Sequence, residues 1–131
     1  CSSRDGFCIA TSEADCRASY FCGEKGRCTL KKNDCEVGGD ADCRASQGCK
    51  TYGYCTAGPH ECIVTSGADC RASLRCKTAG QCTLVASKKS WQKDYLCQPT
   101  SNAECQASQY CKTDGLCRLG RDATNDPSCV K

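Results

Sequence analysis

Cysteine spacing constrains the fold of this chain more than any other feature of its sequence. Of 131 residues, 18 are cysteine, a share above the roughly 8–10% that marks a disulfide scaffold in a short secreted chain. Sixteen of them form four sets with identical steps of 8, 6 and 6 residues. The sets are Cys8, Cys16, Cys22 and Cys28; Cys35, Cys43, Cys49 and Cys55; Cys62, Cys70, Cys76 and Cys82; and Cys97, Cys105, Cys111 and Cys117. Cys1 precedes them and Cys129 follows them. This regularity indicates four tandem repeats.

The residues between the cysteines repeat as well, and they set the repeat boundaries. The segment Asp15-Cys16-Arg17-Ala18-Ser19 recurs at 42–46 and 69–73, and a related segment occupies 104–108. We place a partial unit at 1–7, followed by full repeats at 8–34, 35–61, 62–96 and 97–131. The third repeat carries an insertion at 86–94, and the fourth ends with a closing cysteine.

The apolar core must be thin. Leucine, isoleucine, valine and phenylalanine together contribute only 14 residues. Ordering each residue costs roughly 1–2 kcal/mol of backbone entropy, which so few side chains cannot offset. Cross-links must therefore supply stability. Because no unit can bury a core alone, neighbouring units should stack into an elongated array.

Each unit is predicted to be one short helix followed by one tight hairpin. A serine three residues before an acid predicts a helix N-cap at Ser12, Ser66 and Ser101, and Gly39 takes that position in the second unit. The helix should continue through the Cys-Arg-Ala-Ser segment. Glycines two residues before each fourth cysteine predict left-handed turn positions in the hairpins, and the residues after that cysteine should form the returning strand. These glycines are Gly26, Gly53, Gly80 and Gly115. The predicted fold class is small and disulfide-rich, with little regular secondary structure.

The cysteines are predicted to form disulfides and not to bind metal. No two of them are closer than six positions, and His60 is the only histidine. Zinc sites and redox motifs instead place cysteines two to four residues apart. We therefore expect no metal and no cofactor.

Two pairing rules remain open. The first joins each fourth cysteine to the first cysteine of the next set, and the second to the third within a set, and we favour it because it uses all 18 cysteines. Its pairs are Cys1–Cys8, Cys16–Cys22, Cys28–Cys35, Cys43–Cys49, Cys55–Cys62, Cys70–Cys76, Cys82–Cys97, Cys105–Cys111 and Cys117–Cys129. The rival rule joins first to third and second to fourth within each set, which leaves Cys1 and Cys129 to pair with each other or with neighbouring molecules.

The first residue has two further interpretations. Since the chain opens on Cys1 without a hydrophobic signal region, we expect a mature or trimmed form. Cys-Ser-Ser at a mature N-terminus also resembles an acylated bacterial lipoprotein. Lipidation would leave an odd number of cysteines, which argues against that alternative.

Little in the sequence points to catalysis or to nucleic acid. His60 stands in a Gly-Pro-His-Glu loop, and the repeated acids Asp15, Asp42, Asp69 and Glu104 suit the first turn of a helix. A net charge of +3 is too mild to require nucleic acid. The longest apolar stretches fall far below the ~18 residues that span a bilayer. We expect a non-enzymatic protein with no transmembrane segment.

The insertion is the best candidate for a contact site. The segment from Ser87 to Tyr95 at this insertion holds the only tryptophan, a tyrosine and three lysines, a mixture common at protein and glycan interfaces. The candidate residues are Lys88, Lys89, Trp91, Lys93 and Tyr95. The alternative is that Trp91 and Tyr95 cover the junction between the third and fourth repeats. The expected partners are other proteins or further copies of the chain, or an anionic glycan along stripes of repeated basic residues.

The unit Asp-Cys-Arg-Ala-Ser-x-x-Cys-Lys-Thr-x-Gly-x-Cys and its tandem use resemble the four-cysteine repeats of secreted and cell-surface proteins of myxobacteria and related predatory bacteria. The resemblance covers nearly the whole chain. It implies an extracellular or cell-surface structural module of the bacterial envelope. We therefore expect an exported structural or adhesive protein, a disulfide-stapled rod that acts as a spacer or as a subunit of a surface fibre. The alternative is a soluble multi-headed binder, such as a protease inhibitor or a toxin-like effector.

Overall fold

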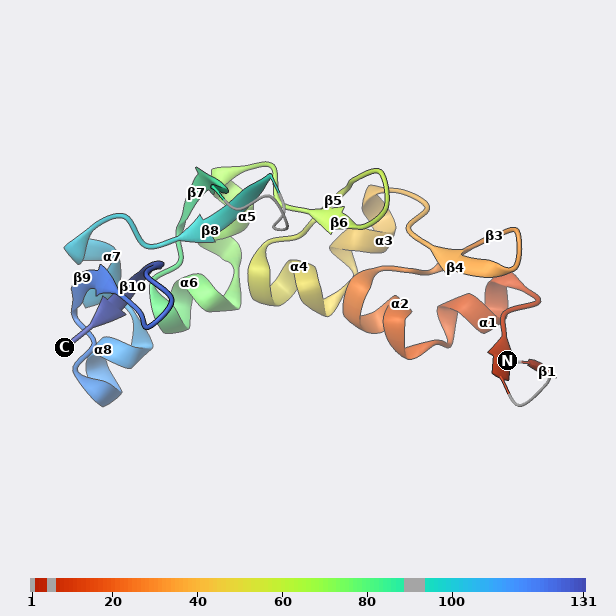
Figure 1. Cartoon of the computed structure of the whole chain (residues 1–131), viewed down its shortest axis with the longest axis horizontal. Coiled ribbons are helices and arrows are strands. Elements are labelled where there is room, and N and C mark those ends of the chain that lie inside the picture. Colours follow the sequence, from red (N-terminus) through yellow and green to blue (C-terminus); the bar gives the residue numbers. More distant parts are fainter. Residues whose placement is uncertain (1, 5–6, 89–93) are drawn as a thin grey trace. The chain divides into compact units, whose positions relative to one another are not determined.

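The computed structural model describes the backbone of residues 2–4 and 7–9, and all atoms of residues 10–88 and 94–131. It forms two compact units. The first contains Cys1–Lys50 and Tyr54–Ile63, and the second contains Thr51–Gly53 and Val64–Lys131. Within the described residues, the order helix, helix, strand, strand recurs four times after an N-terminal hairpin (Figure 1).

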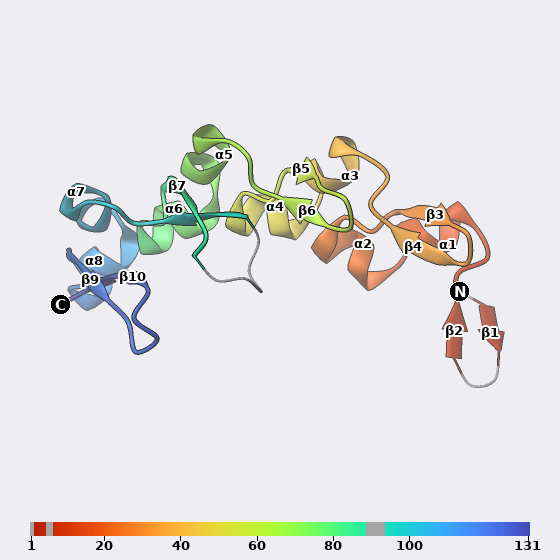
Figure 2. The same cartoon turned by 45° about the horizontal axis from the view of Figure 1, so that its top comes forward.

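The elements are short and regularly spaced. The first helices of the four groups are α1 (Glu13–Arg17), α3 (Asp40–Arg44), α5 (Gly67–Ala72) and α7 (Asn102–Gln106). The second helices are α2 (Tyr20–Lys25), α4 (Gln47–Tyr52), α6 (Leu74–Ala79) and α8 (Gln109–Asp114). The hairpins are β1 (Ser2–Arg4) with β2 (Phe7–Ile9), β3 (Thr29–Lys31) with β4 (Asp34–Glu36), β5 (Thr56–Ala57) with β6 (Cys62–Ile63), β7 (Thr83–Ala86) with β8 (Tyr95–Gln98), and β9 (Arg118–Arg121) with β10 (Pro127–Val130). All five are antiparallel, and Figure 2 shows them as separate two-stranded ribbons.

One repeated serine separates the two helices of each pair. In the third repeat the Ser73 hydroxyl donates to the carbonyl of Cys70 at 2.7 Å and accepts from the Cys76 amide at 3.1 Å. It therefore ends α5 and caps the start of α6 with the same side chain. Equivalent pairs of hydrogen bonds are made by Ser19, Ser46 and Ser108. The prediction that the first helix continues through this serine was wrong.

The segment between the third and fourth cysteines is a second helix and not the predicted hairpin. Its terminal glycines do adopt the predicted left-handed conformation, with φ between 74° and 82°. They act as helix C-caps: the Gly26 amide, for example, donates to the Cys22 carbonyl at 3.0 Å. The strand predicted after the fourth cysteine is present, but it pairs with the strand that carries the next repeat's first cysteine. The hairpin therefore occupies the junction between repeats.

The N-cap predictions held for the three serines. Ser12, Ser66 and Ser101 each accept from the backbone amide three residues later, at 3.1–3.2 Å. The reciprocal capping box is complete at Ser101, whose own amide donates to the Glu104 carboxylate at 3.2 Å. Gly39 starts α3 without a side-chain cap.

The disulfides follow a rule that neither sequence interpretation contained. The second cysteine of each set bonds to the first cysteine of the next set, and the third bonds to the fourth. The eight described bridges are Cys16–Cys35, Cys22–Cys28, Cys43–Cys62, Cys49–Cys55, Cys70–Cys97, Cys76–Cys82, Cys105–Cys129 and Cys111–Cys117. Cys1 and the side chain of Cys8 lie outside the described residues. Both proposed pairing rules were therefore wrong for the other 16 cysteines, although Cys129 does take the place of a first cysteine of a further set.

The small core is made largely of these bridges. Every second cysteine of a set has no exposed surface: Cys16, Cys43, Cys70 and Cys105. The residue two positions after the first cysteine is also buried, as Val37, Val64 and Pro99, and Val37 packs against the Cys43–Cys62 bridge. Sulfur atoms thus occupy positions that large aliphatic side chains hold in ordinary domains.

Successive repeats contact one another through two small surfaces. One is the C-terminal end of the second helix, with its capping glycine and the carbonyl before it, which we call the glycine end. The other is the carbonyl of the acid in the next repeat's first helix together with a sulfur of the long disulfide, which we call the disulfide face. A Cβ on Gly26 would lie 2.8 Å from Cys62 Sγ and 2.9 Å from the Asp42 carbonyl oxygen, so only glycine fits there.

The same contact recurs twice within the second unit. A Cβ on Gly53 would lie 3.0 Å from the Asp69 carbonyl oxygen, and one on Gly80 would lie 2.9 Å from Cys129 Sγ. The sulfur of Cys97 is 3.3 Å from the Tyr52 carbonyl oxygen, which belongs to the same contact. The capping glycine therefore has a second role in packing successive repeats.

In two of the repeats a further link joins the hairpin to the next helix. The Thr29 hydroxyl donates to the buried carboxylate of Asp42 at 2.7 Å, and the Gly38 amide donates to the same oxygen at 2.9 Å. Thr83 donates to Glu104 in the equivalent way. The repeated acids thus lie in the first turn as predicted, and Asp42 and Glu104 also tie consecutive repeats together.

We expect Ser73→Ala to lower the free energy of unfolding by about 2 kcal/mol, because it removes a helix cap and leaves a buried carbonyl with one partner fewer. Ser66→Ala is the matched control: it removes only a half-buried cap and should cost about 1 kcal/mol. Denaturant unfolding with the disulfides intact measures both values. Equal costs would contradict the double role of Ser73.

Candidate functional site

The insertion extends the hairpin between β7 and β8. The last strand pair joins Ala86 to Tyr95, and the Ser87 amide donates to the Asp94 carbonyl at 2.8 Å beyond it. Lys88 is exposed, and Tyr95 keeps 47% of its surface accessible. The other three predicted contact residues, Lys89, Trp91 and Lys93, lie outside the described residues. The contact prediction therefore stays a prediction.

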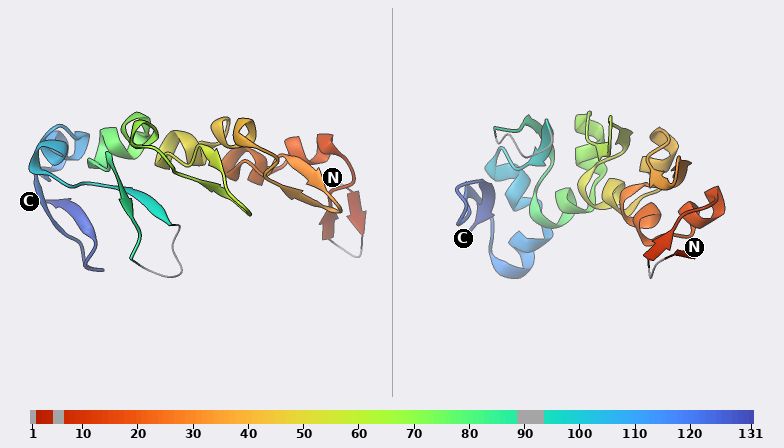
Figure 3. Two further views of the ribbon diagram at one scale, coloured as in Figure 1. Left: turned by 90° about the horizontal axis from the view of Figure 1, so that it is seen from above. Right: turned by 45° about the vertical axis from the view of Figure 1, so that its right-hand side comes forward.

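A cleft separates this hairpin from the next one. It encloses about 990 Å³ and lies wholly within the second unit, between the β7–β8 and β9–β10 hairpins. Figure 3 shows both hairpins extending from the helices on the same side. Apolar side chains from both hairpins line the cleft: Val85, Leu96, Pro99, Leu119 and Pro127. Lys88 lines it as well, so one of the predicted contact residues borders a described cleft.

The polar side of the cleft is a tight turn that connects β9 to β10. The Asp122 carboxylate accepts from the backbone amides of Thr124 and Asp126, at 2.9 and 3.0 Å. Asn125 adopts a left-handed conformation, with φ of 66°. The Arg121 guanidinium donates to the Asn125 carbonyl at 2.8 Å. These bonds hold the Arg121 guanidinium and the Asp126 carboxylate at the border of the apolar lining.

This arrangement is suited to binding and not to holding a metal ion. An apolar floor with a few placed polar groups is typical of sites for small molecules or for side chains of a partner. Among residues 10–88 and 94–131, no three cysteine, histidine or acidic side chains come together as metal ligands would. His60 is exposed in the turn between β5 and β6 and does not line the cleft.

The repeated basic residues do not gather at the cleft. Arg17 makes an ion pair with Glu13 at 3.8 Å across one turn of α1. Lys50, Lys77 and Lys112 are exposed on the second helices. No described helix has the length and apolar character that a membrane crossing requires.

Sequence reasoning missed the second wall of the cleft. The spacing from Cys117 to Cys129 is 12 residues, compared with 7 from Cys28 to Cys35 and from Cys55 to Cys62, and 15 from Cys82 to Cys97. That extra length builds a hairpin with strands of four residues each, β9–β10, beside β7–β8, whose strands have the same length. The sequence signal for this cleft is the pair of consecutive long junctions, Cys82–Cys97 and Cys117–Cys129.

The hairpins are anchored by the first residue of the first helix. The Asp40 carboxylate accepts from the Ala57 amide at 2.8 Å, and the Asn102 side chain accepts from the Leu119 amide at 2.8 Å. Gly67 holds this position in α5 and offers no acceptor. The hairpin that bears the insertion therefore lacks an anchor that its neighbours have.

We expect Gly67→Asp to supply this anchor to the Leu84 amide and to raise the free energy of unfolding by about 1 kcal/mol. The nearest atom to a Cβ there is the flexible end of Arg71, at 3.0 Å, which can move aside. The Leu84 amide should exchange with solvent more slowly. Asp40→Ala is the control, with the opposite effect at Ala57. An unchanged exchange rate at Leu84 would contradict the anchor.

The insertion has a separate test. If it is a contact site, Trp91→Ala should weaken partner binding by about 2 kcal/mol or more and leave the disulfides and thermal midpoint unchanged. If Trp91 instead covers the junction, the same substitution should lower the thermal midpoint and leave binding unchanged. Calorimetry on the isolated chain and a binding titration separate the two outcomes.

The comparisons with known proteins found no match. The chain matches no protein-family model, no curated protein and no solved structure.

Proposed function

We propose that this chain is an exported, non-enzymatic structural or adhesive protein, which acts as an elongated spacer or as a subunit of a surface assembly. The observation that carries the proposal is the repeated contact between a glycine end and a disulfide face. It recurs at Gly26, Gly53 and Gly80 with nearly the same geometry. A contact geometry that repeats between successive units holds those units in register.

The chemistry of the cysteines supports the export part of the proposal. Disulfides persist in oxidising compartments and are rare in the cytosol, where thiols are kept reduced. All cysteines with described side chains are paired. A chain with this little aliphatic core would lose its fold in a reducing compartment.

The contacts between repeats support the spacer part. Each long disulfide joins two sequence repeats, and one of its sulfurs packs against the helix end of the repeat before. Bending at such a junction would separate a buried sulfur from a buried glycine, Cys62 from Gly26 for example. A junction of this kind favours a fixed spacing over a flexible string.

A second candidate is a soluble binding protein that acts through the cleft. The apolar lining between β7–β8 and β9–β10 favours it, because a spacer needs no such cleft. An inhibitor would hold its target there at a fixed stoichiometry. A spacer would act through its ends and its length.

Export and attachment are tested in the bacterium or other organism that encodes the chain. We expect the protein outside the cytoplasm, with the bridges Cys16–Cys35 and Cys43–Cys62 identified by mass spectrometry after alkylation of intact cells. Loss of the gene should reduce surface attachment or cell aggregation, and the exported chain should restore it. A chain with Cys16 and Cys35 both changed to Ala is the matched control and should fail. A cytosolic, reduced protein would overturn the proposal.

A further inference from the structure

The β7–β8 hairpin carries aliphatic side chains on the face that points away from its disulfide. Leu84 pairs with Cys97, and Val85 pairs with Leu96. Because side chains alternate across a strand, Val85 and Leu96 lie on the face opposite the bonded cysteine, which we call the outer face. Gln98 lies on the outer face as well. Val85, Leu96 and Gln98 all line the cleft between β7–β8 and β9–β10.

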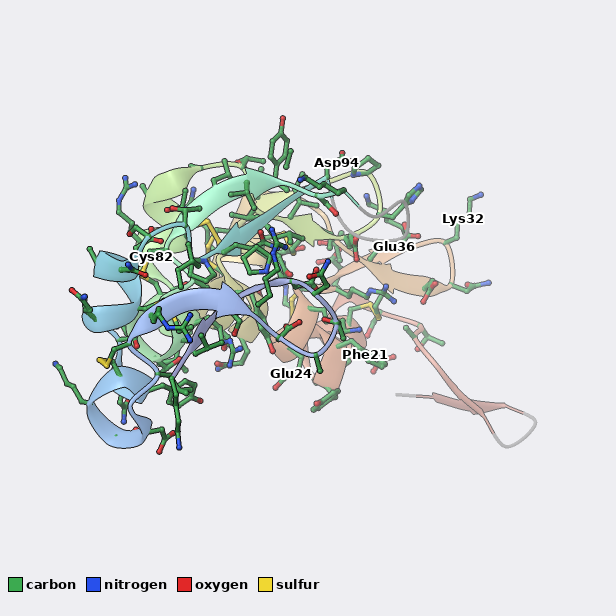
Figure 4. All side chains as sticks on the ribbon, turned by 60° about the vertical axis from the view of Figure 1, so that its left-hand side comes forward. Phe21, Glu24, Lys32, Glu36, Cys82 and Asp94 are labelled. Carbon is green, nitrogen blue, oxygen red and sulfur yellow. A yellow bond between two sulfur atoms is a disulfide. The ribbon has the colours of Figure 1, made fainter. Side chains whose placement is uncertain are left out.

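The β3–β4, β5–β6 and β9–β10 hairpins hold polar or small residues at the two positions of this aliphatic pair. Those residues are Lys31 and Asp34, Gly58 and Glu61, and Gly120 and Ser128, in that order. In β3–β4 the outer face is charged along its length, because Glu36 lies on it beside Lys31 and Asp34 (Figure 4 labels Glu36). A hairpin of this protein therefore forms without the aliphatic pair, and folding alone does not account for the apolar outer face of β7–β8.

The facing wall of the cleft is the inner face of the β9–β10 hairpin. Leu119 lies opposite Cys129, and Arg121 lies opposite Pro127, so these side chains share the face that carries the disulfide. Leu119, Arg121 and Pro127 all line the cleft. Both walls are thus faces of two-stranded sheets, whereas a peptide that adds a strand needs the unpaired backbone groups of a sheet edge. These walls suit an apolar chain that makes few hydrogen bonds.

The charges that border the cleft select the head group of such a chain. Of the charged side chains that line it in the described part of the sequence, Lys88 and Arg121 are cations and Asp126 is an anion. The bond from Arg121 to the Asn125 carbonyl positions the guanidinium, which has five N–H donors and so keeps others for a ligand. The Asp126 carboxylate lies 3.0 Å from the Thr124 hydroxyl of its own turn. The border therefore carries a net positive charge and favours an anion.

We propose that the cleft binds a medium-chain fatty acid, with the aliphatic chain between the two hairpins and the carboxylate against Arg121 and Lys88. A cleft of about 990 Å³ lies at the upper end of the range for ligand sites, so a chain of about ten carbons fits within it. The carboxylate remains hydrated at the border, and the chain leaves water. This inference goes beyond the structural function proposed above and specifies a ligand class for the second candidate, binding through the cleft.

An NMR titration of the oxidised chain with monomeric decanoate tests this assignment. We expect the resonances of Val85, Leu96 and Leu119 to shift together and to saturate at one decanoate per chain, with a Kd of about 1 mM or tighter. Octanoate should bind more weakly, by about two- to fourfold for each CH₂ removed, because less apolar surface leaves water.

The apolar wall is tested by moving a charged pair from one hairpin to another. Val85→Lys combined with Leu96→Asp gives the third hairpin the pair that the first hairpin has at Lys31 and Asp34. This variant should keep its disulfides and weaken decanoate binding at least about tenfold, because charge replaces the apolar wall. Leu74→Asp is the matched control: it removes a half-exposed leucine of α6 that does not line the cleft, and it should bind like the wild type.

The head group is tested without changing the apolar wall, so this arm decides the question even where the double variant fails to fold. Decylammonium has the same chain and a positive head group, and we expect it to bind at least about tenfold more weakly than decanoate. Lys88→Gln should narrow that preference at least about twofold. Lys77→Gln is the control, since Lys77 is exposed on α6 and does not line the cleft.

Three results would overturn the inference: shifts that never saturate, equal binding of decanoate and decylammonium, or a double variant that binds as the wild type does. Tighter binding of a neutral peptide of valine and leucine would also overturn it, because the cleft would then belong to a peptide partner. Export and attachment are measured separately, so a failure here is distinguishable from a failure of the structural function.

Discussion

The long disulfide between one sequence repeat and the next is the constraint on which the rest of the molecule depends. The second cysteine of each set, which is one partner of this bridge, is fully buried. Most of the buried hydrophobic residues among the described ones are cysteines. Bridges of this kind, such as Cys43–Cys62, close loops of 19–27 residues, each worth about 3 kcal/mol in the chain-entropy account. The short bridges close loops with a separation of 6 and mainly fix the second helix. Helices of five or six residues would not persist without both.

The cysteine pattern was sufficient to predict the class of fold and several local features. Disulfides, short helices, small antiparallel hairpins, serine N-caps and left-handed glycines were all predicted from residue spacing. The error lay in assigning the glycines to hairpins. A left-handed glycine ends a helix as readily as it turns a hairpin, and the six-residue spacing between Cys22 and Cys28 is compatible with both. The Ser19 hydroxyl, which accepts from the Cys22 amide, caps a helix here, and the serine was instead assigned to the interior of the first helix.

Pairing could not be predicted for a related reason. Parity and the flanking cysteines were compatible with more than one rule, and we compared rules that kept the second cysteine within its own set. The actual rule carries it into the next set, because the hairpin at the junction brings that strand back onto the first helix. Side chains such as Asp42, which accepts from Thr29 of the preceding repeat, fix this arrangement. The candidate cleft was missed because it needs two adjacent long hairpins, and each junction was considered singly.

Each long disulfide joins the second cysteine of one set to the first cysteine of the next set. This pairing affects how the gene can gain or lose repeats. Removing one period of 27 residues, for example 35–61, would place Cys62 where Cys35 stands and offer Cys16 an equivalent partner. Unequal recombination can therefore lengthen or shorten the coding sequence at any point within a repeat without leaving an odd thiol. Each product would keep the same junction chemistry, so natural variants of different length can arise in single genetic steps.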